Sequence, residues 1–439
     1  MMTQEQILSK IGVGALSAMQ TAAMDAVMKS THDVIILSPT GSGKTLAYLL
    51  PLVQQIDVND NRVQAVVIVP SRELALQSER VLSSMGCGVR GMAVYGGRPT
   101  MDEHREIRKR EPHILFATPG RLNDHIDKNN FNAEDVRYLV IDEFDKCLNM
   151  GFRNEMEQAM NTLPQVQRRI LLSATDANEI PRFVQIDHAV RLDYLNEGEG
   201  DDRIKEYVLR SDEKDKLNTL FQLLCTLGDD SSIVFLNYRD SVERVDLFLR
   251  QSGFITSAYH GGMDQKQRED ALFKFRNGSA NILISTDLAS RGLDIPEVRH
   301  IIHYHLPLGE DEYVHRVGRT ARWKTTGDSY FVLGPEEQLP SYVDSSIEVF
   351  MLPEQIPQPL PPKMATLYIG KGKKDKLSKT DIVGFLCKKG GLKNTEIGRI
   401  DIADRFTYVA VRYDKAKSVI NQTKGEKIKG IKTLVEMVK

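Results

Sequence analysis

The sequence has few of the features that are typical of secreted proteins, of proteins with structural metal sites or of membrane-spanning proteins. Its four cysteines, Cys87, Cys147, Cys225 and Cys387, lie far apart with no CxxC spacing and no close histidine partner, so neither a zinc site nor a disulfide framework is expected. No apolar run approaches the ~20 residues that a membrane helix needs. The start, MMTQEQILSKIGVG, lacks the basic beginning of a signal peptide and its apolar run of about 7–15 residues. We therefore expect a cytoplasmic protein with no membrane partner.

The composition is that of an ordinary globular protein, with 41% hydrophobic and 27% charged residues, and 439 residues suffice for two or three domains. The net charge of −2 hides an asymmetry. Residues 363–439 contain 19 lysines and arginines against 8 acids, a net charge of +11, so residues 1–362 carry −13. This asymmetry indicates a nucleic-acid-binding appendage on an acidic body. A solvated, lysine-rich surface is the alternative.

Short, almost wholly apolar runs alternate with amphipathic helical stretches along most of the chain. Such runs indicate parallel strands that are buried on both faces of a sheet. In the first half they fall at residues 33–38, 65–70, 113–118, 138–142 and 169–174. A second series falls at residues 206–210, 232–237, 256–261, 281–286, 300–305 and 329–334. The pattern predicts two α/β domains, at residues 1–196 and 203–346, joined by the acidic, glycine-containing segment NEGEGDD.

The end of the chain is predicted to form a third, smaller domain. Five prolines between residues 353 and 362 indicate a semi-rigid extended linker at 347–363. Beyond it, residues 364–439 contain strand-like segments and helical stretches near 378–389 and 414–424. The predicted fold class is therefore α/β, with two tandem parallel-sheet domains and a small α+β domain at the C-terminus.

The segment SPTGSGKT, residues 38–45, lies between a predicted strand and a predicted helix, as a phosphate-binding loop requires. Its glycines allow backbone N–H groups to close on phosphate oxygens. Lys44 is placed to reach the β- and γ-phosphates, and the hydroxyl of Thr45 to bind Mg²⁺. The alternative is a coincidental glycine turn, which the strand and helix on either side disfavour.

Two adjacent carboxylates end the predicted strand in YLVIDEFD, residues 138–145. Asp142 is placed to hold Mg²⁺ and Glu143 to polarise an attacking water. An acidic pair at a strand end is a weak signal alone, because many helix N-termini look alike, but it becomes strong beside a phosphate loop.

An arginine cluster lies in the second predicted domain, in HRVGRTAR (315–322) and around Arg291. The planar guanidinium stays ionised and binds phosphoryl oxygens in pairs. A structural salt-bridge network is the alternative reading. Together with the two segments of the first domain, the cluster favours an ATP site built in a cleft between two domains.

These segments and others resemble, in order, the motifs of DEAD-box RNA helicases from about residue 10 to 335. The matching segments are Gln20 in GVGALSAMQ, SPTGSGKT, PSRELALQ, Gly96-Gly97, TPGR, DEFD, SAT, IVFLN, QKQR, STDLASRGLDIP and YVHRVGRTAR. The resemblance implies two RecA-like domains that close around ATP, Mg²⁺ and single-stranded RNA, and an ATP hydrolase with RNA helicase activity.

Residue roles follow from the resemblance, position by position. The catalytic group comprises Lys44, Asp142, Glu143, Arg319 and Arg322, with Arg319 and Arg322 as arginine fingers. Nucleotide contacts fall on Gln20, Thr40, Gly41, Ser42, Gly43, Lys44, Thr45 and Asp294, and Mg²⁺ on Thr45 and Asp142. Hydrolysis and domain closure would be coupled through Asp145, Ser173, Thr175 and His315. Contacts to the RNA backbone fall on Arg72, Gly97, Thr118, Arg121, Gln265, Arg268, Thr286 and Gly292, which favours binding without base selection.

The sequence departs from the family pattern in two places. Phe144 stands where the family usually has alanine, although Asp142, Glu143 and Asp145 are all intact, so activity is expected to survive. Many members carry an aromatic residue about 17 positions before the adenine-reading glutamine, but residues 1–30 contain no Phe, Tyr or Trp. The stacking on adenine is therefore the carried-over role with least support.

In the basic tail, GKKDK is followed by DIVGFL and IGRIDI. This combination resembles the RNA-binding domain of DbpA-type DEAD-box helicases, a variant RRM fold. Tyr368, Phe406 and Tyr408 lie where an RRM carries base-stacking aromatics, and simple strand core is the alternative. Electrostatic attachment to RNA is expected from Lys371, Lys373, Lys374 and Lys376.

The resemblance implies a monomeric helicase that separates short RNA duplexes locally. It also implies binding of structured ribosomal RNA through the tail, in pre-ribosomal particles during large-subunit assembly. An ATP-gated RNA clamp, a general helicase of cold adaptation or RNA turnover, and a DNA helicase are the alternatives.

Overall fold

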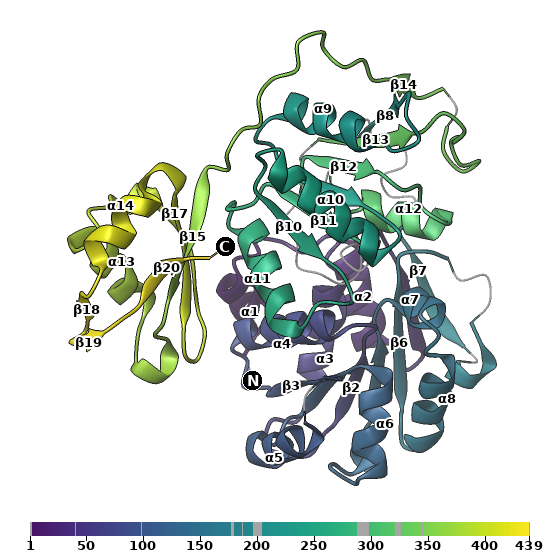
Figure 1. Ribbon diagram of the computed structural model, residues 1–439. Coiled ribbons are helices and arrows are strands. Elements are labelled where there is room, and N and C mark those ends of the chain that lie inside the picture. The colour runs from purple at the N-terminus through teal and green to yellow at the C-terminus, as the bar shows by residue number, and fades with distance from the viewer. Residues whose placement is uncertain are drawn as a thin grey trace. The chain divides into compact units, whose positions relative to one another are not determined.

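The computed structural model describes residues 2–39, 41–97, 99–176, 180–186, 188–195, 204–287, 298–320, 326–344 and 346–438. These residues form two compact units that meet in the sequence near residue 201. Figure 1 shows the elements of each unit. Among the described residues, no helix combines the length and the apolar character needed to cross a membrane.

The first unit is built on a seven-stranded parallel sheet with the order β3-β4-β2-β5-β6-β1-β7. Its strands are β1 (Asp33–Leu37), β2 (Ala65–Ile68), β3 (Gly91–Val94), β4 (Ile114–Ala117), β5 (Tyr138–Ile141), β6 (Arg168–Ser173) and β7 (Ala189–Asp193). Its helices are α1 (Gln4–Ile11), α2 (Ala18–Lys29), α3 (Lys44–Gln55), α4 (Arg72–Met85), α5 (Thr100–Arg110), α6 (Pro119–Asp127), α7 (Phe144–Asn149) and α8 (Arg153–Thr162).

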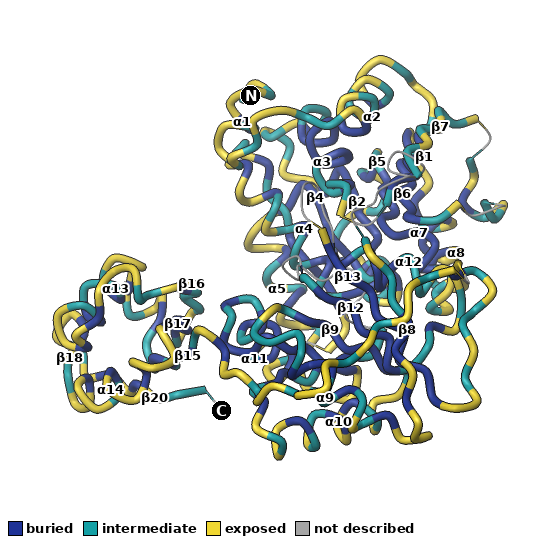
Figure 2. Tube along the Cα trace, turned by 90° about the horizontal axis from the view of Figure 1, so that it is seen from above, coloured by how far each residue is buried: buried dark blue, intermediate teal, exposed yellow. Residues whose placement is uncertain are grey.

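The central stretches of most strands are apolar because both faces of the sheet are covered by helices. Successive side chains of a strand point to opposite faces, so Val34 and Ile36 belong to one hydrophobic cluster and Ile35 and Leu37 to the other. Figure 2 shows the strands buried and the outer sides of many helices exposed. The polar loops that connect strands and helices therefore lie at the two ends of the strands.

The second unit contains a sheet with the same arrangement, all parallel, in the order β10-β11-β9-β12-β13-β8-β14. Its strands are β8 (Ile204–Arg210), β9 (Ser232–Phe235), β10 (Thr256–Tyr259), β11 (Ile282–Ser285), β12 (His300–His303), β13 (Gly327–Leu333) and β14 (Glu348–Val349). Its helices are α9 (Leu217–Leu227), α10 (Arg239–Gln251), α11 (Gln265–Arg276) and α12 (Glu310–Val317). Two parallel-sheet α/β folds were predicted from the sequence, and this prediction is confirmed.

The end of the chain forms a small domain within the second unit. Its antiparallel sheet has the order β16-β17-β15-β20, and the elements follow the order βαββαβ of a split βαβ fold. The elements are β15 (Met364–Ile369), α13 (Lys379–Lys388), β16 (Ile397–Ile402), β17 (Thr407–Arg412), α14 (Tyr413–Thr423), the hairpin β18 (Lys427–Ile428) and β19 (Ile431–Lys432), and β20 (Val435–Met437). It has a hydrophobic cluster of its own, including Leu367, Val409 and Leu386. The predicted small α+β domain is therefore confirmed.

The proline-rich stretch before this domain lies against the parallel sheet. Strand β14 pairs with β8, and the N–H of Phe350 donates to the carbonyl of Val208 at 2.8 Å. The ring of Phe350 makes T-shaped contacts with the rings of Tyr207 and Tyr330. Leu352 and Ile356 pack on the hydrophobic cluster to which these two tyrosines belong. The beginning of the stretch is therefore fastened to the sheet rather than free in solvent.

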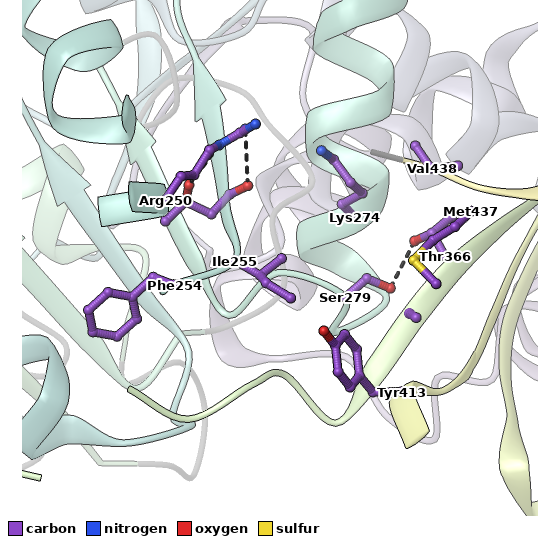
Figure 3. Close-up of a pocket in the computed structure, with 11 residues that line it drawn as sticks. Arg250, Phe254, Ile255, Lys274, Ser279, Thr366, Tyr413, Met437 and Val438 are labelled. Carbon is purple, nitrogen blue, oxygen red and sulfur yellow. Dashed lines mark hydrogen bonds between the residues drawn. The ribbon is translucent and has the colours of Figure 1, made fainter. Parts of the chain in front are cut away.

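The small domain also packs directly against α11 of the second unit. The ring of Tyr408 lies 4.8 Å from that of Phe273, and its hydroxyl donates to Asp270. Asn277 Nδ2 donates to Thr366 Oγ1 at 2.8 Å, and Thr366 donates to Ser279 at 2.8 Å. Figure 3 shows Thr366 and Ser279 at this seam, beside a cavity of about 260 Å³.

The buried hydroxyl of Thr366 should contribute measurably to the stability of the second unit. Thr366→Val keeps the shape of the side chain but leaves the buried amide of Asn277 without that acceptor. We expect a loss of about 1–3 kcal/mol in the free energy of unfolding, measured by urea denaturation. Thr380→Val, at an exposed position of α13, is the matched control. Equal unfolding midpoints for the two variants would contradict the assignment.

Candidate functional site

Most of the predicted site segments of the first unit follow the carboxyl ends of its parallel strands, and the strand order divides these segments into two groups. The phosphate loop, DEFD and SAT follow β1, β5 and β6, which are neighbours in the sheet. The segments PSRE, TPGR and Gly96-Gly97 follow β2, β4 and β3, which are also neighbours. One half of the edge therefore carries the nucleotide candidates and the other half the RNA candidates, in the position where open α/β sheets bind ligands.

The phosphate loop has the backbone shape that its glycines permit. Gly41 and Gly43 have φ values of 83° and 85°, and Gly43 is the N-cap of α3. A Cβ atom on Gly43 would press against Gln20 Nε2, so a larger residue there would displace Gln20 and would also be strained at this positive φ. Ser42 and Thr45 are half-buried, and the remaining loop candidate, Thr40, lies outside the described residues.

Gln20 is held against this loop by both ends of its side-chain amide. Nε2 donates to the carbonyl of Gly43 at 3.2 Å, and Oε1 accepts from the N–H of Ser17 at 3.0 Å in a capping box at the start of α2. The side chain is buried. The structure thus brings the predicted adenine-reading residue to the loop, although 23 positions separate it from Gly43.

Lys44 is buried at the first position of α3, and its ammonium group donates to the carbonyls of Ser38 at 2.6 Å and Pro39 at 3.0 Å. Burial lowers its pKa to about 8, against the opposing attraction of Asp142 and Glu143. A phosphate placed at this helix N-terminus would stabilise the charged form.

Asp142 and Glu143 are both buried at the end of β5. Burial, together with the charge of Glu143, raises the pKa of Asp142 to about 7, and Lys44 opposes the shift. Glu143 has φ 53° and ψ 50°, the left-handed conformation that residues other than glycine rarely adopt. Such backbone strain concentrates at functional sites.

A partner of Glu143 that was not predicted from the sequence is Lys146. Its Nζ lies 2.8 Å from Glu143 Oε1, and both side chains are buried. The spacing of three residues on a helix is the signal that was available, since such residues share a helix face.

Phe144 belongs to the hydrophobic cluster on one face of the sheet and is buried. Its ring therefore points into the core and away from the three acids around it in sequence. Phe144, the residue of DEFD that departs from the family pattern, is therefore part of the hydrophobic core.

Three of the four residues predicted to couple hydrolysis to closure meet at the ends of β5 and β6. Thr175 Oγ1 donates to Asp145 Oδ2 at 3.0 Å. Ser173 Oγ donates to the carbonyl of Thr175 at 2.6 Å and accepts from its N–H at 3.2 Å. Their fourth member, His315, lies buried on α12 in the other unit.

The RNA candidates of the first unit lie on the other half of the edge. Gly97 is exposed with φ 95°, and Arg72 Nη1 lies 3.4 Å from the place where a Cβ on Gly97 would be. Thr118 is the N-cap of α6, and its N–H donates to the carbonyl of Val94 at 3.2 Å. Arg121, on α6, donates through Nη1 to Thr100 Oγ1 at 2.7 Å. Two neighbouring turns therefore present these groups together.

In the second unit the described RNA candidates follow β10 and β11, again neighbouring strands. Arg268 is buried and donates to the carbonyls of Gly261 at 2.9 Å and Met263 at 3.1 Å. Gln265 donates to Glu269 at 2.9 Å, and Thr286 is half-buried. The remaining candidates, Gly292 and Asp294, lie outside the described residues.

The arginine cluster divides between two environments. Arg316 is fully buried and pairs with Asp287 through two bonds of 2.6 and 2.7 Å. It also donates to the carbonyl of His305 and lies over the ring of Phe235. The structural salt bridge considered from the sequence is thus present at Arg316. Arg319 is buried just after α12, and Arg291 and Arg322 lie outside the described residues.

The four lysines of the small domain that were predicted to attach RNA lie on one loop, which backbone hydrogen bonds hold in place. Lys373, Lys374 and Lys376 are exposed and Lys371 is half-buried. The N–H groups of Lys373 and Lys374 donate to the carbonyls of Ala403 and Asp404, both at 2.9 Å. The aromatic residues Tyr368, Phe406 and Tyr408 contact one another on one sheet face, with centroids 5.0 to 5.9 Å apart.

Among the described residues, no three or more His, Cys, Asp or Glu side chains are grouped to hold a metal ion. Thr45 and the buried Asp142 supply two oxygen donors beside the phosphate loop. This donor set fits Mg²⁺, which is commonly bound by one or two protein oxygens together with substrate phosphates and water.

Comparisons with known proteins match every part of this architecture. Three family profiles match: DEAD/DEAH box helicase at residues 17–183, helicase conserved C-terminal domain at 215–324, and DbpA RNA binding domain at 366–437. The chain is 34% identical to the ATP-dependent RNA helicase DbpA of Escherichia coli (strain K12), over 98% of this chain and 96% of that protein. It is 30% identical to the DbpA of Bacillus subtilis (strain 168), over 96% and 95%.

Two solved structures share the fold. Mss116p bound to single-stranded RNA and AMP-PNP is 26% identical with a TM-score of 0.70, over 80% of this chain and 78% of that one. The Dbp5 of S. cerevisiae bound to RNA and ADP BeF3 is 25% identical with a TM-score of 0.67, over 76% and 87%.

The lowered pKa of Lys44 predicts proton uptake when a nucleotide binds. At pH 8.5 the lysine is mostly neutral without ligand, and a phosphate raises its pKa, so ADP binding without Mg²⁺ should take up roughly half a proton or more. At pH 6.5 the lysine is already charged and takes up none. Calorimetric titrations in two buffers of different ionisation enthalpy measure this uptake. Its absence at pH 8.5 would contradict the described environment of Lys44.

Proposed function

Because the chain belongs to the DEAD-box ATP-dependent RNA helicases of DbpA type, we propose that it is an RNA-stimulated ATPase that separates short RNA duplexes locally. The observation that carries the proposal is the division of one sheet edge into a nucleotide half and an RNA half. The hydrogen bond between Thr175 and Asp145 lies on the nucleotide half and joins the segment after β6 to the segment after β5. Loss of the γ-phosphate beside the DEFD segment would therefore be transmitted to the segment that follows β6. Binding of both ligands would shift the chain toward its hydrolysing state.

The nucleotide half supports a division of labour among its residues. The loop from Thr40 to Thr45 would surround the phosphates, with Lys44 as the charged group and Gln20 beside adenine. Thr45 and Asp142 would hold Mg²⁺, which neutralises phosphate charge when bound. Glu143, already oriented by Lys146, would polarise the attacking water. Asp294 would contact the ribose, and Arg319 and Arg322 would act as arginine fingers.

The RNA half supports contacts to backbone rather than bases. In the first unit the proposed contacts are Arg72, Gly97, Thr118 and Arg121, and in the second they are Gln265, Arg268, Thr286 and Gly292. Glycine N–H groups, hydroxyls and guanidinium groups suit phosphate and sugar, so binding should be indifferent to sequence.

Specificity is proposed to come from the basic domain at the C-terminus. Residues 364–439 would bind structured ribosomal RNA through Lys371, Lys373, Lys374 and Lys376, and the two helicase domains would span 1–196 and 203–346. In this proposal the chain acts as a cytoplasmic monomer on pre-ribosomal particles of the large subunit. The net charge of +11 on residues 363–439 supports this part.

Glu143→Gln should abolish turnover and spare binding. Removing a group that polarises the attacking water typically lowers kcat by about 100-fold or more, while the phosphate loop is untouched. Steady-state ATPase rates with and without single-stranded RNA, together with ADP affinity, measure both effects. Glu157→Gln, exposed on α8, is the matched control.

Two outcomes of that experiment would contradict the proposal: an RNA-independent rate in the unaltered chain, or full turnover in Glu143→Gln. A duplex-release assay completes it. If ATP holds the protein on RNA without releasing strands, the chain is an RNA clamp.

The exposed lysines Lys373 and Lys374 should contribute to the electrostatic part of the RNA affinity of the small domain. In the double variant Lys373→Glu and Lys374→Glu, binding of a structured ribosomal RNA fragment should weaken, and the slope of log affinity against log salt should fall by about 2. Lys415→Glu with Lys417→Glu, exposed on α14, is the charge-matched control. Fluorescence anisotropy measures both pairs, and equal losses in the two pairs would exclude the loop as the contact.

A further inference from the structure

A buried acid lies between the two RNA-facing turns of the first unit. Glu103 is 1% exposed, although it belongs to α5, whose sequence TMDEHREIRKR has only Glu103 and Ile107 buried. Burying a carboxylate is costly unless hydrogen bonds or opposite charges compensate it. Its partners therefore indicate what holds this acid in place.

The two oxygens of Glu103 bind to two different turns. Oε1 accepts from the N–H of Tyr95 at 3.2 Å, and Tyr95 directly precedes Gly96-Gly97. Oε2 lies 3.4 Å from Nη1 of Arg121, the last residue of TPGR, and 3.1 Å from Nε2 of His125, one turn further along α6. A single side chain thus joins the turn after β3 to the turn after β4.

The neighbours of Glu103 keep its partners oriented. Asn130 Nδ2 contacts His125 Nδ1 at 2.6 Å, which leaves Nε2 of the ring to donate to Glu103. Thr100, on the same helix as Glu103, accepts from Arg121 at 2.7 Å. The guanidinium is therefore held from two positions of α5. A carboxylate suits this place because both of its oxygens accept, whereas a glutamine amide would turn an N–H₂ group toward one of the donors.

We propose that Glu103 is a positioning residue for RNA binding, which fixes the spacing and orientation of the turns at 96–97 and 118–121. Because it is buried it does not touch RNA itself, and it acts through Arg121 and the backbone at Tyr95. The inference rests on the proposed RNA contacts of Gly97, Thr118 and Arg121. It adds to them the residue that holds the two turns together.

The test is Glu103→Gln in the full chain, with Glu106→Gln as its control. Glu106 lies on the same helix, with a side chain that is 43% exposed and paired with Arg110. Binding of a labelled single-stranded RNA is measured by anisotropy, and RNA-stimulated ATPase gives kcat and the RNA concentration at half-maximal rate. We expect Glu103→Gln to weaken RNA binding tenfold or more and to raise that concentration equally. The kcat at saturating RNA and the ADP affinity should stay within twofold.

A double-variant cycle with Arg121→Lys separates positioning from general loss of structure. If Glu103 acts through Arg121, the double variant should bind RNA about as weakly as the weaker single variant, because contacting residues are not additive. Fully additive losses would overturn the proposal. Equal loss of ADP affinity would overturn it too, since that result indicates a general structural effect.

Thr100→Val provides a second route if Glu103→Gln does not fold. It removes another acceptor of Arg121 at a half-buried position and should weaken RNA binding in the same direction by a smaller factor, with kcat unchanged. Unaltered RNA binding in the variants that fold would overturn the inference. Absence of RNA binding in the unaltered chain would instead contradict the proposed function, so the two failures are distinguishable.

Discussion

The functional surface depends on one constraint, which is that all strands of each large sheet run parallel and both sheet faces are covered. Parallel strands end at a common edge, and helices exclude polar groups from the two faces. Charged side chains in the loops can therefore gather only at the ends of the strands. In the first unit this places Lys44, Asp142 and Glu143 at one half of the edge and Arg72 and Gly97 at the other. The order of the strands in the sheet thus determines which loops are neighbours.

The second sheet shows that a covered parallel sheet does not by itself produce a phosphate loop. Lys216 is the N-cap of α9 after β8, in the place that corresponds to Lys44 at the start of α3 after β1. Its ammonium group, however, donates to Glu337 at 2.6 Å and to the carbonyl of Val332 at 2.9 Å. The loop before it, SDEKDK, has no glycine. The same fold therefore uses one lysine for an internal ion pair and leaves the other facing a glycine loop.

Much of this could be predicted from the sequence because it depends on local patterns. Apolar runs predicted the positions of most strands in both sheets. The family resemblance named Thr175 and Asp145 among the coupling residues, and the structure joins these two by a hydrogen bond. Strand β3, Gly91–Val94, was not predicted, since a four-residue run that begins with glycine carries little signal. The role of Glu103 was also missed, because a helix rich in charges is typical of a solvent-exposed element. Its burial depends on Arg121 and His125, which arrive from α6 through tertiary packing.

The aromatic face of the small domain required the structure for a similar reason. Alternation correctly places Phe406 and Tyr408 on one face, and the sequence left base stacking and strand core as alternatives. Tyr408 instead packs on Phe273 and donates to Asp270, both on α11.

Helix α11 thus carries two different sets of contacts. Its first turn holds the RNA candidates Gln265 and Arg268, and its later turns hold the small domain. Packing along this seam restricts the volume that the domain can sample, and in the proposed function this would raise the effective concentration of an RNA that binds both parts. The contacts of Tyr408 and Thr366 with α11 and its C-terminal end therefore help to place the lysine loop at 371–376, together with the proline-rich linker.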